Sequence, residues 1–263
     1  MSPNQPRTFH YNACAHGFSA NFTRPFHHNI SVIAPSALPI TGGHGTSREE
    51  NFKFEQFISI KAAYSHVSGS HQPEDDTNNT LSTAVLEGLN MFDVLTADRI
   101  VSRLYSKHQP NAAEGNITWV GSKFENLRIA GCPVQIELNT KLFHNPEKPE
   151  LDLDTYAKAK TDFDSGGEFS KICSDPLTGE PLTPKNFRGA FLCSIVKKIV
   201  VDHPGVTVHG HSIKVAGFGK VYLGELLIKN AEKNLTMLRF KLGSSTDGGG
   251  SGGGSRSNGT HYP

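Results

Sequence analysis

The chain has 263 residues, a formal net charge of +1 at pH 7 and only 19% charged side chains. Near-zero charge gives no general attraction to nucleic acid or to an anionic membrane surface. No stretch approaches the roughly eighteen apolar residues of a membrane-spanning helix. We therefore expect neither nucleic-acid binding nor membrane insertion. The 26 glycines and the low charged share favour a turn-rich β protein.

Apolar and polar residues alternate along much of the chain, as they do in strands with one buried face. The alternation is clearest over residues 58–65, 134–139 and 238–242. Further strands are expected at 9–23, 28–34, 81–91, 116–121, 124–130, 191–201, 206–209, 211–216 and 219–229. Glycine, proline, asparagine and aspartate separate these segments. The pattern predicts a mainly-β fold, an antiparallel sandwich or a barrel-like domain, with extended termini.

Two segments depart from simple alternation. Residues 92–108 fit a helical stripe as well as a strand, and we interpret them as a strand because strands flank them. Residues 151–163 combine helix-forming side chains with early acids and later lysines, which favours a short helix. This helix lies in a polar, proline-containing insertion over residues 144–188.

The C-terminal residues have the composition of a flexible linker. They read G-S-S-T-D-G-G-G-S-G-G-G-S-R-S-N-G-T-H-Y-P from Gly243 onward. We therefore divide the chain into one β-rich domain over 1–243 and a separate tail over 244–263. Because such a strip has few side chains with which to fold itself, a fixed shape would require contact with another subunit. Residues 1–12 could lie across a neighbour in the same way.

The cysteines and the N-terminus carry little functional information. Cys14, Cys132, Cys173 and Cys193 are widely spaced and form no C-x-x-C motif, which argues against a zinc ribbon or a redox dithiol. Four buried thiols are favoured, with one or two disulfides as the alternative. The first residues show no secretory signal pattern.

The histidine pair of the sequence His209-Gly210-His211 is the sharpest candidate for a metal site. Residues i and i+2 of a strand share a face, so both imidazoles could bind one metal ion. A third ligand would come from His203 or Glu225. The alternative is two surface histidines beside a turn, and no cofactor is expected overall.

Two other patterns are weaker. Glu87 and Glu125 lie among apolar strand residues and could form the carboxylate pair of a glycosidase, but such glutamates also occur routinely on the wet faces of strands. The glycine-rich run 42–47 lacks the ending of a phosphate-binding loop and is predicted to form a hairpin turn.

Three stretches carry a resemblance to known proteins. They read V-L-E-G-L-N-M-F-D-V-L-T-A-D-R-I-V, G-S-K-F-E-N-L-R-I-A-G-C-P-V and H-S-I-K-V-A-G-F-G-K-V-Y-L-G-E. Over about residues 80–243 the chain resembles a family of uncharacterised bacterial proteins and, more distantly, the choice-of-anchor P surface proteins. The resemblance implies a β-rich extracellular or cell-surface protein, and it transfers no catalytic residues.

Three functions follow as hypotheses. The first is a non-enzymatic structural subunit that assembles with copies of itself into a filament or a surface layer. The second is a carbohydrate- or ligand-binding β-sandwich module, whose groove would need aromatic side chains such as Trp119, Tyr222 and Tyr262. The third is a metal-dependent enzyme built on His209 and His211.

Overall fold

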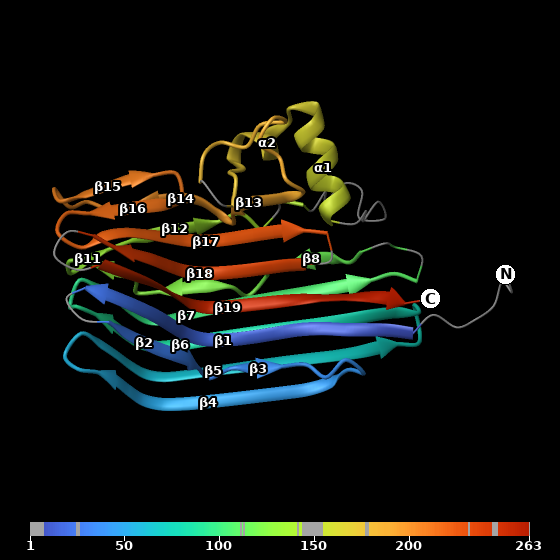
Figure 1. The fold of residues 1–263 in the computed structure, drawn as a ribbon, viewed down its shortest axis with the longest axis horizontal. Coiled ribbons are helices and arrows are strands. Elements are labelled where there is room, and N and C mark those ends of the chain that lie inside the picture. The colour runs from blue at the N-terminus through green and yellow to red at the C-terminus, as the bar shows by residue number, and fades with distance from the viewer. Residues whose placement is uncertain are drawn as a thin grey trace, which may run out of the picture.

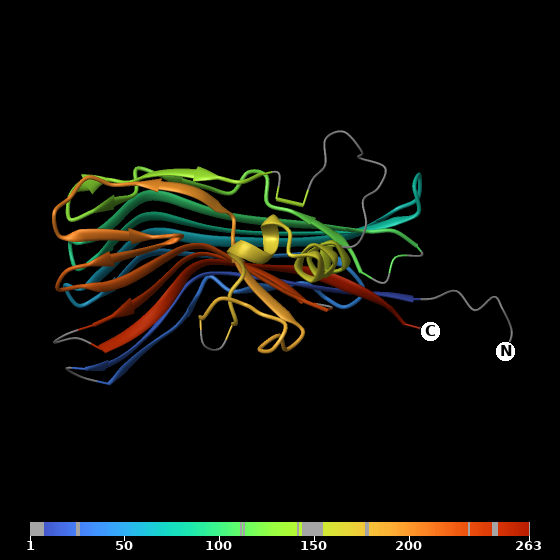
Figure 2. The same cartoon turned by 90° about the horizontal axis from the view of Figure 1, so that it is seen from above.

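The protein is a sandwich of two antiparallel sheets with two short helices at one edge (Figures 1 and 2). The computed structural model describes residues 8–24, 27–110, 112, 114–140, 142–143, 155–176, 179–230, 232–243 and 247–262, without the side chains of 261 and 262. The predicted mainly-β sandwich is confirmed, and the sheets do not close into a barrel.

The first sheet has nine strands in the order β15-β16-β17-β18-β19-β1-β2, with β13 also beside β17 and β3 also beside β1. Its strands are β1 (Thr8–Arg24), β2 (His28–Ile33), β3 (Ser36–Ala37), β13 (Ala190–Ser194), β15 (Val206–His209), β16 (Ser212–Val215), β17 (Gly219–Lys229), β18 (Glu232–Leu242) and β19 (Asp247–Tyr262).

The second sheet has eight strands in the order β11-β10-β7-β6-β5-β4, with β8 and β9 also beside β7. Its strands are β4 (Gly43–Phe54), β5 (Ile58–Gln72), β6 (Thr77–Met91), β7 (Leu95–His108), β8 (Asn116–Thr118), β9 (Lys123–Glu125), β10 (Arg128–Ile129) and β11 (Cys132–Pro133). The ambiguous segment 92–108 is thus a strand over most of its length, as predicted. A separate ladder pairs β12 (Gln135–Leu138) with β14 (Val196–Val200).

Two helices cover the upper edge of the sandwich in Figure 1. Helix α1 (Thr155–Ser165) falls within the predicted insertion, and the short helix α2 (Glu168–Ile172) was not expected. Phe169 of α2 packs edge-on against Phe191 of β13 at 5.5 Å between ring centroids. The amide of Ile117 in β8 donates to Thr155 Oγ1 at 3.0 Å, which ties α1 to the second sheet. Neither helix in the described part of the chain is long and apolar enough to cross a membrane.

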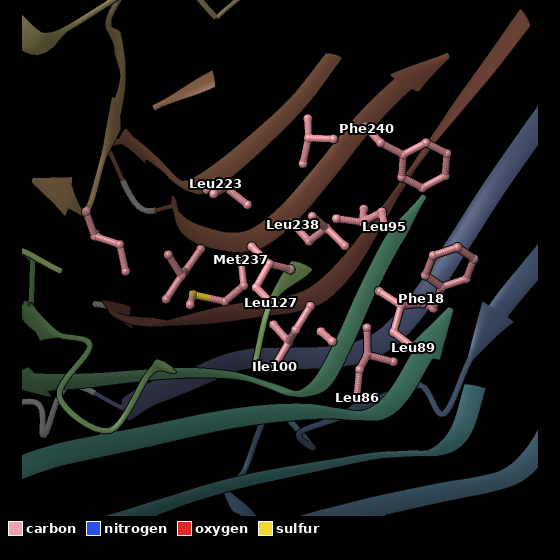
Figure 3. Packing of buried hydrophobic residues seen from close by; sticks show 14 of the residues in the cluster. Phe18, Leu86, Leu89, Leu95, Ile100, Leu127, Leu223, Met237, Leu238 and Phe240 are labelled. Carbon is pink, nitrogen blue, oxygen red and sulfur yellow. The ribbon is translucent and has the colours of Figure 1, made fainter. Parts of the chain in front are cut away.

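The sheets enclose a continuous apolar core to which most strands of both sheets contribute. Facing strands supply the side chains that Figure 3 shows, among them Phe18, Leu86, Leu89, Leu95, Ile100, Leu127, Leu223, Met237, Leu238 and Phe240. Each of these residues is at most 2% exposed. Burial of apolar surface at this scale is the main stabilising contribution to the fold.

The interior near the start of β1 and the end of β19 combines a small apolar cluster, which includes Phe9 and Val67, with buried polar groups. Tyr11 donates from its hydroxyl to Asn78 Oδ1 at 3.0 Å, and Ser257 of β19 donates to the carbonyl oxygen of Thr80 at 3.1 Å. Lys233, which is fully buried, forms an ion pair with the nearly buried Glu114. Buried polar groups of this kind stabilise a fold only while they keep their partners.

The glycine-rich C-terminal strip forms β19, a central strand of the first sheet (Figure 1). It pairs with β1 along nearly its whole length and with β18 on its other side. The expected separation of a 244–263 tail from the β-rich domain is therefore wrong for residues 247–262. Backbone hydrogen bonds to two neighbouring strands compensate for the missing side chains, so the chain itself supplies the partner that we had assigned to another subunit.

Glycine is required in β19 because neighbouring groups lie over it. A Cβ atom built on Gly250 would lie 2.4 Å from the carbonyl oxygen of Ser19 and 2.8 Å from the Cβ of Ala20. The imidazole of His16 occupies the corresponding space above Gly254, with its Cε1 only 2.1 Å from such a Cβ. Glycine in a strand interior commonly marks such a close approach. The glycines of β19 therefore leave the space that atoms of the neighbouring strands occupy.

A single methyl group on this strand should therefore be destabilising. We expect Gly250→Ala to lower the free energy of unfolding by about 1–3 kcal/mol, because the backbone of Ser19 cannot move aside without breaking strand pairing. Gly243→Ala is the matched control, since its Cβ would meet only the Cα of Gly219 at 3.9 Å. Urea unfolding followed by circular dichroism measures both, and equal midpoints would contradict this packing.

The four cysteines are free thiols in the described residues. Cys173 and Cys193 are buried, whereas Cys14 and Cys132 are half-buried. Burial raises the pKa of the Cys173 thiol and of the Cys193 thiol, which keeps both protonated and unreactive. The favoured interpretation as thiols is confirmed, although only two of them are fully buried.

Candidate functional site

The structure does not place His209 and His211 on one strand. His209 ends β15 and pairs with Ser212 of β16, while Gly210 and His211 form the two-residue turn between them. Gly210 has a φ of +58°, which the primed turns of such hairpins require. The argument that residues i and i+2 share a face therefore fails here. Within the described ranges, no cluster of three or more histidine, cysteine or acidic side chains could hold a metal ion.

His211 belongs to an ion-pair cluster on the outer face of the nine-stranded sheet, the face turned away from the second sheet. Its Nε2 lies 3.4 Å from Glu225 Oε1, and Arg239 donates to both oxygens of Glu225 at 2.5 and 2.6 Å. The Arg239 guanidinium also lies 3.7 Å above the ring centroid of Tyr222. A guanidinium that already neutralises the carboxylate disfavours a metal cation, so the cluster fixes Arg239 rather than binding metal.

Because of this cluster, the free energy of unfolding should depend on pH. Burial by itself would raise the pKa of Glu225, but hydrogen bonds from Arg239 and His211 outweigh it and hold that pKa below its usual value. A carboxyl group with a lowered folded-state pKa stabilises the fold at pH values above its unfolded pKa. That contribution disappears as the pH falls through the folded-state pKa.

We therefore expect Glu225→Gln to lower the free energy of unfolding by about 1–3 kcal/mol near neutral pH. The difference from the wild-type protein should shrink on acidification toward about pH 3. Glu125→Gln is the control, because an exposed ion pair such as that of Glu125 with Lys123 contributes little. Urea midpoints across this range test the prediction, and a difference that stays constant with pH would refute it.

Glu87 and Glu125 lie on either side of Arg99 rather than facing each other across a cleft. Arg99 of β7 pairs in register with Glu87 of β6 and with Glu125 of β9, and its Nε lies 3.6 Å from Glu87 Oε1. Two strand spacings, about 9.6 Å, separate the backbones of the glutamates. The arrangement is a charge ladder on the outer face of the second sheet, and it does not support the proposed glycosidase pair.

Three lysines form a straight row on the outer face of the nine-stranded sheet. Lys214 of β16 lies directly opposite Lys220 of β17, which lies directly opposite Lys241 of β18. All three side chains are exposed, and their strand neighbours alternate inward to the core. We call Lys214, Lys220 and Lys241 the basic row. Beyond Lys241 the same line continues through Gly249 to Asn21.

Two adjoining shallow hollows lie on this face, one over the basic row and one beside it. One, of about 370 Å³, extends over the β16–β17 turn and the start of β17 and includes all three lysines. The other, of about 480 Å³, follows the glycine strand between the side chains of β1 and β18. Lys241 lines both hollows, Tyr222 lines the first and Arg239 the second. Because β19 has no bulky outward side chain here, its backbone forms the floor of the second hollow.

The expected aromatic lining is only partly present. Trp119 is 3% exposed and its indole nitrogen donates to the carbonyl oxygen of Asn139 at 2.9 Å, so it cannot stack on a ligand. Tyr222 lines the first hollow, but the Arg239 guanidinium covers its ring at 3.7 Å. The side chain of Tyr262 lies outside the described residues.

The sequence reasoning missed the basic row, although a signal was present. Residues at equal distances from a hairpin turn face each other, and the turns after β16 and β17 bring the three lysines together. The alternation predicts a strand only from Leu238, whereas β18 begins at Glu232. The glycine strand β19, which lies next to Lys241, has no alternation of apolar and polar residues by which it could be predicted.

Comparison with known proteins adds a family but no activity. No curated protein and no solved structure matches this chain. A family model described as a domain of unknown function, DUF8256, matches residues 9–229, which extends from β1 to the end of β17. The matched region covers most of the chain and includes Lys214 and Lys220. The protein therefore belongs to the DUF8256 family.

Proposed function

We propose that this chain is a non-enzymatic carbohydrate-binding module, and that its ligand lies against the outer face of the nine-stranded sheet. The observation that carries the proposal is the pair of adjoining hollows over β16, β17, β18, β19 and β1. Each falls within the size range of small-ligand sites, and together they form an open track rather than an enclosed pocket. An open track suits an extended chain that enters and leaves along the surface.

The side chains along this track suit sugar hydroxyl groups. Asn21, Thr23 and Ser251 line the second hollow and offer an amide and two hydroxyls, which can both donate and accept hydrogen bonds. Arg239 adds donors, and its position is fixed by Glu225. Groups that are held in place before binding lose less conformational freedom when the ligand arrives.

A cell-surface location agrees with this function. The resemblance to choice-of-anchor P proteins implies such a location, where the face would meet polysaccharide. Assembly of copies of this chain into a filament or a surface layer stays a prediction. The composition of the C-terminal strip suggested such an assembly, but it no longer supports one, because the strip pairs within its own sheet.

The test uses a bulky side chain that blocks the track for any ligand. Ser251 points outward, is half-buried and lines the second hollow, so Ser251→Trp fills it. Ser59→Trp is the matched control, a half-buried serine on the outer face of the second sheet. On an array of neutral and acidic glycans, we expect binding by the wild-type protein and by Ser59→Trp but not by Ser251→Trp. An array without wild-type binding, or binding that Ser251→Trp leaves unchanged, would overturn the proposal.

A further inference from the structure

The basic row concentrates like charge on one face of the molecule. Like charges directly opposite each other on neighbouring strands destabilise a sheet, yet Lys214, Lys220 and Lys241 occupy three consecutive strands in register. Of the described residues, no acidic group lies within ion-pairing distance of these three lysines. Several other exposed basic side chains do have such partners, for example Arg48 with Glu50, Lys107 with Asp75, Lys160 with Asp164 and Lys197 with Glu137.

The arrangement of the three charges points to the shape of what they bind. A single small anion is held by groups that converge on one point, whereas these lysines lie in a line across about 10 Å of sheet. Neighbouring strands are about 4.8 Å apart, which is comparable with the length of one sugar residue in an extended polysaccharide. A chain that crosses the strands would therefore present one sugar to each lysine.

We infer that the ligand is an acidic polysaccharide whose carboxylates pair with the basic row while its sugars follow the track across the strands. This inference rests on the proposed function and names the chemical class of its ligand. Past Lys241 the line continues over the backbone of Gly249 to Asn21 and Asn29. The lysines therefore anchor one part of the chain, and amide side chains offer hydrogen bonds to the next part, which lies in the hollow that Asp247 also lines.

The amide and hydroxyl side chains of Asn21, Thr23 and Ser251 in the second hollow favour a polysaccharide over single-stranded nucleic acid. Proteins that hold single strands without sequence preference stack the bases on free aromatic faces. Tyr222 is the one aromatic side chain among the described residues that line these two hollows on their outer surface, and the Arg239 guanidinium covers its ring at 3.7 Å. The core residues Phe218 and Phe240 border the hollows from below but are buried.

The test compares two forms of one polymer. Polygalacturonate carries a carboxylate on every sugar, and its fully methyl-esterified form keeps the sugars without the charge. We expect the wild-type protein to bind polygalacturonate by calorimetry, more weakly as salt is added, because salt screens exposed charges. The double variant Lys220→Gln/Lys241→Gln should bind at least about tenfold more weakly, since it loses two charge-assisted contacts.

The control variant is Lys53→Gln/Lys61→Gln, which removes the same charge from exposed positions on the second sheet and should bind within about twofold of the wild-type protein. Equal weakening by both double variants would overturn the inference. So would tighter binding of an oligothymidylate that depends on the same lysines. A third outcome separates the inference from the proposed function. If the wild-type protein binds the methyl ester, and Ser251→Trp abolishes that binding whereas Lys220→Gln/Lys241→Gln does not, the ligand is not acidic but the carbohydrate-binding function stands. If the wild-type protein binds neither form of the polymer and no glycan of the array, both the inference and the proposed function are rejected.

Discussion

Deletion of residues 244–263 is expected to abolish folding. Strand β19 lies between β1 and β18, and its inward side chains contact β6 and β7 through the hydrogen bonds of Ser257 and Ser255. Without it the nine-stranded sheet separates into two parts, and the core around Leu86 and Ile100 is opened to water. The loss should exceed the typical total stability of a domain, about 5–15 kcal/mol.

The truncated chain should therefore show neither a cooperative urea transition nor native circular dichroism. A synthetic peptide of residues 247–263 provides the control, because it can restore the sheet by strand addition. Recovery of a cooperative transition on adding the peptide would assign the effect to the strand itself. A truncated chain with the same unfolding midpoint as the intact one would show that the C-terminal strip is dispensable.

At about pH 6, where the Lys233 amine is protonated, Lys233→Met is expected to lower the free energy of unfolding by about 3–5 kcal/mol, because it removes the ion-pair partner of the buried Glu114 carboxylate. The double variant Lys233→Met/Glu114→Gln should recover most of this loss, since neither charge then remains in the interior. A double-mutant cycle measured by urea unfolding gives the coupling between the two side chains. Single variants whose effects simply add would contradict the buried pair.

The same pair should respond to pH in a defined direction. Burial lowers the pKa of Lys233 to about 7, below its value in the unfolded chain. Above about pH 7 the folded protein therefore binds fewer protons than the unfolded chain, and stability from this group rises with pH toward the unfolded pKa. The coupling with Glu114 should be larger at about pH 6 than at about pH 9, because only the protonated amine forms an ion pair.

Strands with strict alternation could be predicted from the sequence because one face of each is buried. The segment 219–229 matches β17, and the segments at 9–23 and 81–91 fall within β1 and β6. Local pattern reflects local burial, and here burial follows directly from packing of the two sheets. The existence of these strands required no knowledge of their partners.

Elements stabilised by partners far away in the sequence could not be predicted in this way. Strand β19 has no side-chain pattern, and its conformation depends on β1, whose residues lie more than 220 positions earlier in the chain. Strand β4 was missed because it lies at a sheet edge and is polar on both faces, with charges that discourage pairing with another chain. The run 42–47, expected as a hairpin turn, mostly belongs to this strand.

The candidate site was even less accessible from the sequence. The sequence suggests Glu225 only as a third metal ligand, whereas the structure pairs it with Arg239, fourteen residues away on the next strand. The basic row depends on the register of two successive hairpins, and a shift of one residue would turn one of the lysines inward. Composition shows a net charge near zero and conceals this local concentration of charge.

The position of the glycine strand supports both the fold and the candidate binding face, and amide hydrogen exchange tests it most directly. In dilute solution of the intact protein, we expect the amides of residues 249–258 to exchange as slowly as those of β1 and β18, at a rate independent of protein concentration. Hydrogen bonding within one chain requires this result. Fast exchange of these amides, or protection that increases with protein concentration, would show that the strip is not held by its own sheet.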